Sequence, residues 1–143
     1  MGFELLEGIT SADYAYRCRE ADLDGLFRES ALAMTALLLE NPAAVEKREE
    51  RGLHLENPAA DMLLYNYLGE FIYYKDSENL LLLPGAVKVW EEAGLFRLDA
   101  VLVGERIDPS RHLFHVDIKA VTLHGLEVVK EGDLWRATVV LDV

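Results

Sequence analysis

The spacing of apolar residues predicts two amphipathic helices in the first half of the chain. Asp22 is a residue type that favours a helix N-cap, and apolar residues follow it at steps of three and four. That first apolar face comprises Leu23, Leu26, Phe27, Ala31, Met34, Leu37 and Leu38. A second helix is predicted to open at Asn57-Pro58, because proline suits the first helical position. The second face comprises Ala60, Leu63, Leu64, Tyr67, Leu68, Phe71 and Ile72. We expect both faces to be buried.

Alternation with a period of two predicts strands around these helices. Residues 3–7 and the run Tyr14, Tyr16 and Cys18 are strand candidates, with a turn at residues 8–11 between them. Further on, we expect a turn at residues 76–79 and a polar loop at 104–109. Between them lie three predicted short strands, 80–83, 87–90 and 95–103, separated by Pro84-Gly85 and Ala93-Gly94.

The last third of the chain carries the most regular alternation. Val116, Ile118 and Ala120 alternate with polar neighbours, which predicts a half-buried strand through residues 111–124. Such a strand would present Asp117, Lys119 and His124 from a stiff element. A final strand is predicted at residues 134–143, after a turn at Gly132-Asp133.

Helices interspersed with strands predict an α+β fold, with two helices packed on mixed or antiparallel sheets. The chain has 143 residues, no internal repeat and no low-complexity linker. We therefore expect a single domain spanning residues 1–143, long enough to bury a substantial core.

The charge balance narrows the class of partner. The net charge is −12, from 26 acidic and 14 basic residues. The basic residues Lys47, Arg48 and Arg51 are interleaved with glutamates, so no basic patch is predicted and strong direct binding to nucleic acid is not expected. An acidic surface favours a protein partner with a basic face.

Cysteine usage and hydropathy point to the cytoplasm. Cys18 is the single cysteine, which excludes an internal disulfide and fits a reducing compartment. Its position in an alternating run favours a small core residue over a nucleophile. No secretory signal and no apolar run long enough to span a bilayer is recognisable. We therefore expect a cytoplasmic protein that does not associate with a membrane.

The candidate chemistry is rich in oxygen ligands. If the first and last strands are neighbours, Asp13, Asp142 and the carboxylate of Val143 could converge, and such ligands suit calcium or magnesium. Asp13 could instead be a turn residue that hydrogen-bonds nearby backbone. His112 and His115 would point to opposite faces of a strand, so a metal site from this pair is not expected.

Four stretches of the sequence resemble the archease family. The late motif, Arg111-His112 followed by residues 116–124, resembles the family's lysine-alanine-valine-threonine motif with its histidine. The end of the chain, residues 135–143, has the family's hydrophobic-Asp-hydrophobic ending. Residues 27–34 and 63–68 resemble its two helices, although Asn66 stands where an aspartate is usual.

This resemblance implies an activator rather than an enzyme. Archeases promote guanylylation and multiple turnover of an RtcB-type RNA ligase in tRNA splicing or RNA repair. The resemblance implies a divalent cation, expected to be calcium, at Asp13, Asp142 and Val143, and assigns ligase activation to Lys119. GTP and manganese would belong to the partner ligase. In the early metal motif, Thr10 replaces the family's histidine and Ala15 its glycine.

Two other functions remain open from the sequence. One is a small metal-dependent phosphoester hydrolase, with Asp13 and Asp142 as ligands and His124 as general base. The other is a metal-free protein-interaction or chaperone-like module, whose stability would not respond to calcium or chelator. Asp117 and His124 are accessory candidates in the late motif.

Overall fold

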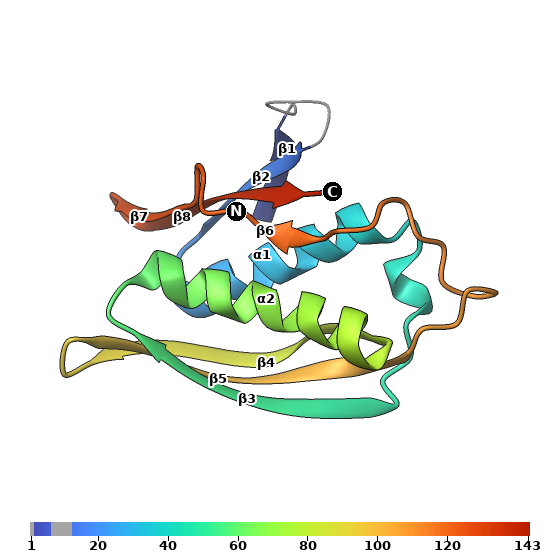
Figure 1. Ribbon diagram of the computed structural model, residues 1–143. Helices are drawn as coiled ribbons and strands as arrows, with labels where there is room; N and C mark the ends of the chain where they lie inside the picture. Colours follow the sequence, from blue (N-terminus) through green and yellow to red (C-terminus); the bar gives the residue numbers. More distant parts are fainter. Residues whose placement is uncertain (1, 7–12) are drawn as a thin grey trace.

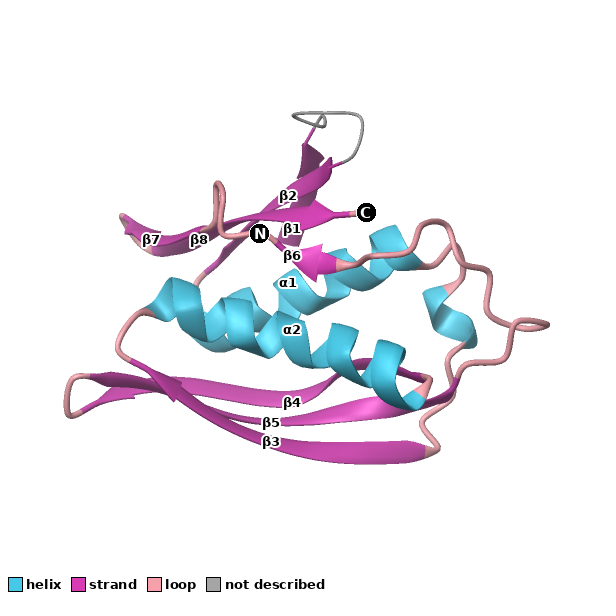
Figure 2. Ribbon diagram, viewed as in Figure 1, coloured by secondary structure: helices cyan, strands magenta, loops and turns pink. Residues whose placement is uncertain are grey.

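Two helices lie between two antiparallel sheets in the computed structural model, which describes residues 2–6 and 13–143 (Figures 1 and 2). All strand pairs among these residues are antiparallel. The expected α+β fold is therefore confirmed, and the sheets of the described part are antiparallel rather than mixed. Apolar side chains from both helices and both sheets form one core cluster.

The first sheet joins the two ends of the chain. Its order is β1-β2-β8-β6, and β7 pairs with β8 as well. The bounds are β1 Gly2–Leu6, β2 Asp13–Glu20, β6 Ala120–Val121, β7 Glu127–Glu131 and β8 Leu134–Asp142. The condition set for the convergence of Asp13 and Asp142 is met by the pairing of β2 with the last strand, β8, whereas β1 pairs with β2.

The second sheet covers the other side of the helices. Its order is β3-β5-β4, with bounds β3 Glu49–Asn57, β4 Leu80–Glu92 and β5 Leu95–Arg106. The predicted turn at Ala93-Gly94 is confirmed, and both residues have positive φ, 54° and 79°. Pro84-Gly85 does not end a strand, because β4 passes through it with a bulge and continues along β5. The two strands predicted at residues 80–83 and 87–90 are therefore parts of the single strand β4.

The helices bury the faces predicted for them. Helix α1 spans Leu23–Leu38, and the Asp22 carboxylate accepts a hydrogen bond from the Gly25 N–H at 2.8 Å. A short 3-10 turn, η1, follows at Pro42–Ala44. Helix α2 spans Ala60–Glu78. The fully buried residues of the two helices include Leu26, Phe27, Ala31, Leu63, Leu64, Tyr67 and Leu68.

Three predicted boundaries are wrong by a few residues. Asn57 ends β3, and its side chain accepts the Ala59 N–H at 2.9 Å, so α2 begins after it at Ala60. The turn expected at residues 76–79 is the last turn of α2, which ends at Asn79 with a φ of 53°. Residues 104–106 belong to β5 rather than to a loop.

The strand predicted through residues 111–124 is also wrong. In the part of it that pairs with β8, Ala120 lies opposite Asp142 and Val121 opposite Leu141. Asp142 is the last residue of β8, so the ladder stops at Ala120; among the described residues before it, only the main-chain N–H of Lys119 donates to the main chain of β8, at the Asp142 carbonyl oxygen. The β5–β6 connection, residues 107–119, is consequently irregular and hydrogen-bonds to the ends of both helices.

Two further predictions concern the turn before β2 and the absence of a membrane-spanning segment. The turn at residues 8–11, with Thr10, lies outside the described residues. Among the described helices, none is long and apolar enough to cross a membrane.

The close approach of β4 to β5 at Leu81 makes Gly104 intolerant of a side chain. An added Cβ would lie 1.9 Å from the Leu81 carbonyl oxygen, whereas at Gly52 of β3 it would meet nothing within 4 Å. We expect Gly104→Ala to lower the free energy of unfolding by about 3 kcal/mol or more, because a backbone oxygen must move. Gly52→Ala should change it by less than about 0.5 kcal/mol. Urea unfolding measures both, and equal stability of the two variants would contradict the close approach.

Candidate functional site

Two aspartates face each other where β2 pairs with the last strand, β8. Asp13 begins β2 and lies directly opposite Asp142, the last residue of β8. Residues directly opposite in an antiparallel pair project to the same side of the sheet, with Cβ atoms about 4.5–5.5 Å apart. Both residues are half-buried. The register therefore brings together two of the carboxylates predicted from the sequence.

Lys119 reaches the same end of this sheet from the β5–β6 connection. Its N–H donates to the Asp142 carbonyl oxygen at 2.8 Å, and the next residue, Ala120, pairs with Asp142. Lys119 is exposed and borders a groove of about 430 Å³. Side chains of α2 line the opposite side of this groove, including Tyr65, Asn66, Glu70 and Tyr73.

The candidate metal ligands at this strand end are all oxygen atoms. Among the described residues, no group of three or more His, Cys, Asp or Glu side chains is placed to hold a metal. Asp13 and Asp142 supply two carboxylates, and Val143 follows Asp142 directly and would add main-chain oxygens. Oxygen ligands without thiolate or imidazole suit calcium or magnesium.

The two accessory candidates lie in different surroundings. Asp117 accepts a hydrogen bond from Lys75 of α2 at 2.9 Å, so its carboxylate points to the helix. His124 is exposed in the turn after β6, and its carbonyl oxygen accepts the Thr122 hydroxyl at 3.1 Å. Asp117, Lys119 and His124 all lie outside the strands, so the expectation that a strand presents them is wrong.

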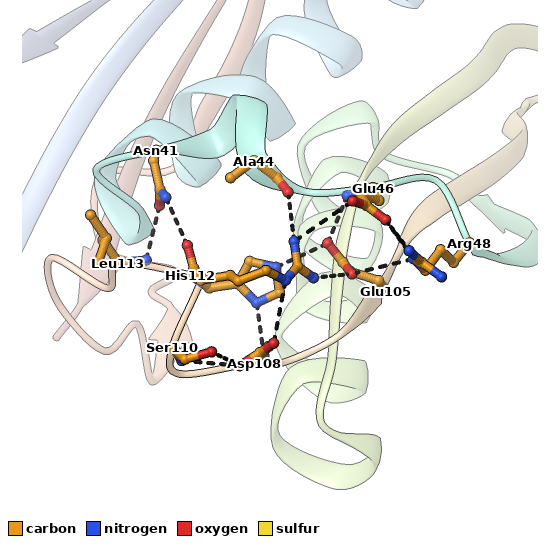
Figure 3. Close-up of polar contacts among 10 residues, drawn as sticks. Asn41, Ala44, Glu46, Arg48, Glu105, Asp108, Ser110, His112 and Leu113 are labelled. Carbon is orange, nitrogen blue, oxygen red and sulfur yellow. Dashed lines mark hydrogen bonds and ion pairs between the residues drawn. The ribbon is translucent and has the colours of Figure 1, made fainter.

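A buried polar network at the start of the β5–β6 connection was not predicted (Figure 3). Glu105 is 4% exposed and accepts hydrogen bonds from the Glu46 N–H at 2.7 Å, from His112 at 3.0 Å and from Arg111. The Asp108 N–H donates to His112 Nδ1 at 2.8 Å, so the ring proton is on Nε2 and points at Glu105. His112 is thus a buried histidine with both nitrogens satisfied.

The partners of Glu105 decide its charge state. Burial would raise the pKa of this carboxyl, but the Glu46 N–H, His112 and Arg111 together lower it from 4.5 to about 2. The network joins the end of β5 to the chain before β3. The sequence placed Glu105 in a predicted loop, so its burial was not expected. The one local signal for the network is the turn at Asp108-Pro109, which suggests that the chain reverses towards His112.

Cys18 has the environment expected of a core residue. It is fully buried, and burial raises the pKa of its thiol to about 12, against a weaker opposing effect of the Ser30 hydroxyl. The thiol is therefore neutral near pH 7 and a poor nucleophile. His54 and His115 lie at the surface, paired with Asp99 and Glu40.

The fold and the acidic strand end define a small α+β protein with two central helices and paired terminal strands. A model of the archease protein family matches residues 3–143, so the chain belongs to the archease family. The family resemblance seen in the sequence is thereby confirmed.

Individual relatives match over nearly their whole length. The chain is 31% identical to the protein archease of Pyrococcus abyssi, over 93% of this chain and 94% of the relative. It is 32% identical to that of Methanothermobacter thermautotrophicus, over 99% of both chains. A solution structure of a Methanobacterium thermoautotrophicum protein, 31% identical, superimposes with a TM-score of 0.84 over 99% of both chains.

A more distant structure shares the fold alone. The crystal structure of an archease from Thermotoga maritima, described as a possible chaperone, has a TM-score of 0.64 at 18% identity. That match covers 98% of both chains.

Removing the Glu105 charge should destabilise the protein in a pH-dependent way. We expect Glu105→Gln to cost about 3 kcal/mol near neutral pH, because the amide has no charge and keeps one acceptor oxygen, so either Arg111 or the Glu46 N–H and His112 lose their acceptor. The folded-state pKa lies below the ordinary value, so this stabilisation is complete above pH 4.5 and is lost as the pH falls towards about 2.

Urea unfolding at pH 7 and at low pH tests this expectation. Glu127→Gln is the matched control, since Glu127 pairs with Arg136 at the surface and should matter by less than about 1 kcal/mol. A Glu105→Gln deficit that stays constant between pH 7 and pH 2.5 would show that its charge is not responsible.

Proposed function

We propose that this archease-family protein is a non-enzymatic accessory factor of an RtcB-type RNA ligase. It would dock on the ligase and promote guanylylation and multiple turnover in tRNA splicing or RNA repair. The observation that carries the proposal is the strand register that sets Asp13 opposite Asp142 with Lys119 bonded to the same residue. These are three of the four positions that the family resemblance assigns to cation binding and ligase activation, the fourth being Val143.

The cation would act on the shape of the docking surface. Asp13, Asp142 and Val143 would hold calcium, which supplies a fixed positive charge between carboxylates that otherwise repel each other. Asp142 also accepts the Lys119 N–H through its carbonyl oxygen. Ordering the end of β8 would therefore order the main chain of Lys119 as well.

Lys119 is suited to act on a partner rather than within this chain. Its side chain is exposed at the rim of the groove beside α2. A lysine ammonium is a compact point charge on a flexible stem, which can reach phosphates or carboxylates in a neighbouring active site. GTP and manganese would be bound by the ligase, and the chemistry would take place there.

The charge distribution agrees with a protein partner. The net charge of −12 disfavours direct contact with an RNA backbone and favours a basic face on the ligase. The buried, neutral thiol of Cys18 and the doubly hydrogen-bonded His112 also have structural environments. The charge balance is the feature that supports a protein partner, and it leaves the hydrolase with His124 as general base as the second candidate.

Lys119→Ala should abolish stimulation of the ligase without unfolding the protein. The side chain is exposed, so its loss should change the free energy of unfolding by less than about 0.5 kcal/mol. Lys47→Ala is the matched control, because Lys47 is also exposed and belongs to the distant chain before β3. A ligation time course with the cognate ligase, GTP and a 3′-phosphate RNA measures both variants. Wild-type stimulation by Lys119→Ala would rule out the assigned role.

Calcium should stabilise the wild-type protein through the two aspartates. A ligand present at 100 times its Kd adds about 2.7 kcal/mol, which raises Tm by roughly 8–10 °C for a domain of this size. Chelator should reverse the rise, and Asp142→Asn should remove most of it. Asp133→Asn, in the exposed β7–β8 turn, should keep it. An identical calcium response in both variants, measured by thermal unfolding, would exclude Asp142 as a ligand.

A further inference from the structure

The β5–β6 connection, residues 107–119, is irregular but held at many points. Figure 1 shows it in orange, leaving the end of β5 and passing the ends of both helices on its way to β6. Asn41 binds it twice: its side-chain NH2 donates to the Arg111 carbonyl at 2.8 Å, and its oxygen accepts the Leu113 N–H at 2.9 Å. The His115 N–H donates to the Leu38 carbonyl at 2.8 Å.

The last attachment before Lys119 is an ion pair to α2. Lys75 lies in the last turns of α2 and is only 7% exposed. Its ammonium donates to Asp117 at 2.9 Å and to Asp76 at 2.5 Å. Burial would lower the pKa of Lys75, but hydrogen bonds to Asp117 and Asp76 raise it above its usual 10.5. The ammonium therefore stays charged and holds the connection against the helix.

Three consecutive residues are then fixed by three different parts of the fold. The Asp117 carboxylate is bound by Lys75, the Ile118 side chain is 1% exposed in the core, and the Lys119 N–H donates to Asp142. The chain has no strand ladder in this stretch to set its direction. The direction in which Lys119 leaves the surface therefore depends on these side-chain anchors.

We propose that Lys75 and Asp117 are positioning residues, which hold the Lys119 main chain against the end of β8 and so aim its ammonium at the partner. The importance of this aim for ligase stimulation depends on the function proposed above. Neither Lys75 nor Asp117 needs to touch the ligase for this role.

The two carboxylates on Lys75 allow a closely matched experiment. Asp117→Asn and Asp76→Asn each remove one negative charge next to the same ammonium, and each leaves it one carboxylate partner. Only Asp117 belongs to the β5–β6 connection, whereas Asp76 is in α2 itself. The two substitutions should thus have similar effects on the charge of Lys75 and on stability. They should differ in their effect on the position of Lys119.

Hydrogen exchange of single amides provides a readout that is independent of the ligase. In Asp117→Asn, the Lys119 amide should exchange about tenfold faster, while the Thr122 amide, which donates to Val140 at 2.9 Å on the same β8 edge, should keep its rate. Asp76→Asn should leave both amides near their wild-type rates. Equal Lys119 rates in the two variants would overturn the positioning role.

Ligase stimulation then tests the consequence. Asp117→Asn should lower stimulation about tenfold, and Asp76→Asn less than about twofold, because small displacements of an acting group are costly. If the wild-type protein fails to stimulate the ligase, the proposed function is rejected and the exchange rates alone decide the positioning role.

Discussion

The pairing of β2 with β8 is the constraint on which the rest of the structure depends. It joins the two ends of the chain through a continuous register from Asp13–Asp142 to Glu20–Trp135. Tyr16 and Cys18 lie opposite Val139 and Ala137 in this register, and all four are fully buried against the helices. A shift by one residue would turn these side chains to the other face of the sheet. Burial of the core thus fixes the same register that sets the two aspartates opposite each other.

The buried charges in this protein serve a different purpose from the exposed ones. Glu105 and Lys75 are 4% and 7% exposed, and each binds a part of the β5–β6 connection. A segment without a strand partner needs such side-chain anchors, because its backbone groups alone do not specify one conformation. Lys119, by contrast, is exposed, and Asp13 and Asp142 are half-buried at a sheet end. The first group anchors the β5–β6 connection, and the second comprises the residues proposed to act on a cation or a partner.

The two groups also lie in different parts of the fold. The polar residues with the most partners lie away from the strand end where the cation and Lys119 are proposed to act. Substitutions in the two groups should therefore separate: the first should affect stability and the second should affect function. The Lys75–Asp117 pair connects them, since it is partly buried and ends two residues before Lys119.

The sequence by itself determined the elements whose periodicity comes from burial on one face. Both helices, β2 and β8 were predicted for this reason, and so was the approach of Asp13 to Asp142 once the end strands were assumed to pair. The family followed from motifs spread along the chain. The alternation through Val116, Ile118 and Ala120 predicted a strand that does not form. A strand needs a neighbour to pair with, and β8 ends opposite Ala120. The partners of Lys75 and Glu105, up to 42 and 59 residues away, depend on how the layers pack. Local sequence carries no signal for such contacts, so only the tertiary structure decided them.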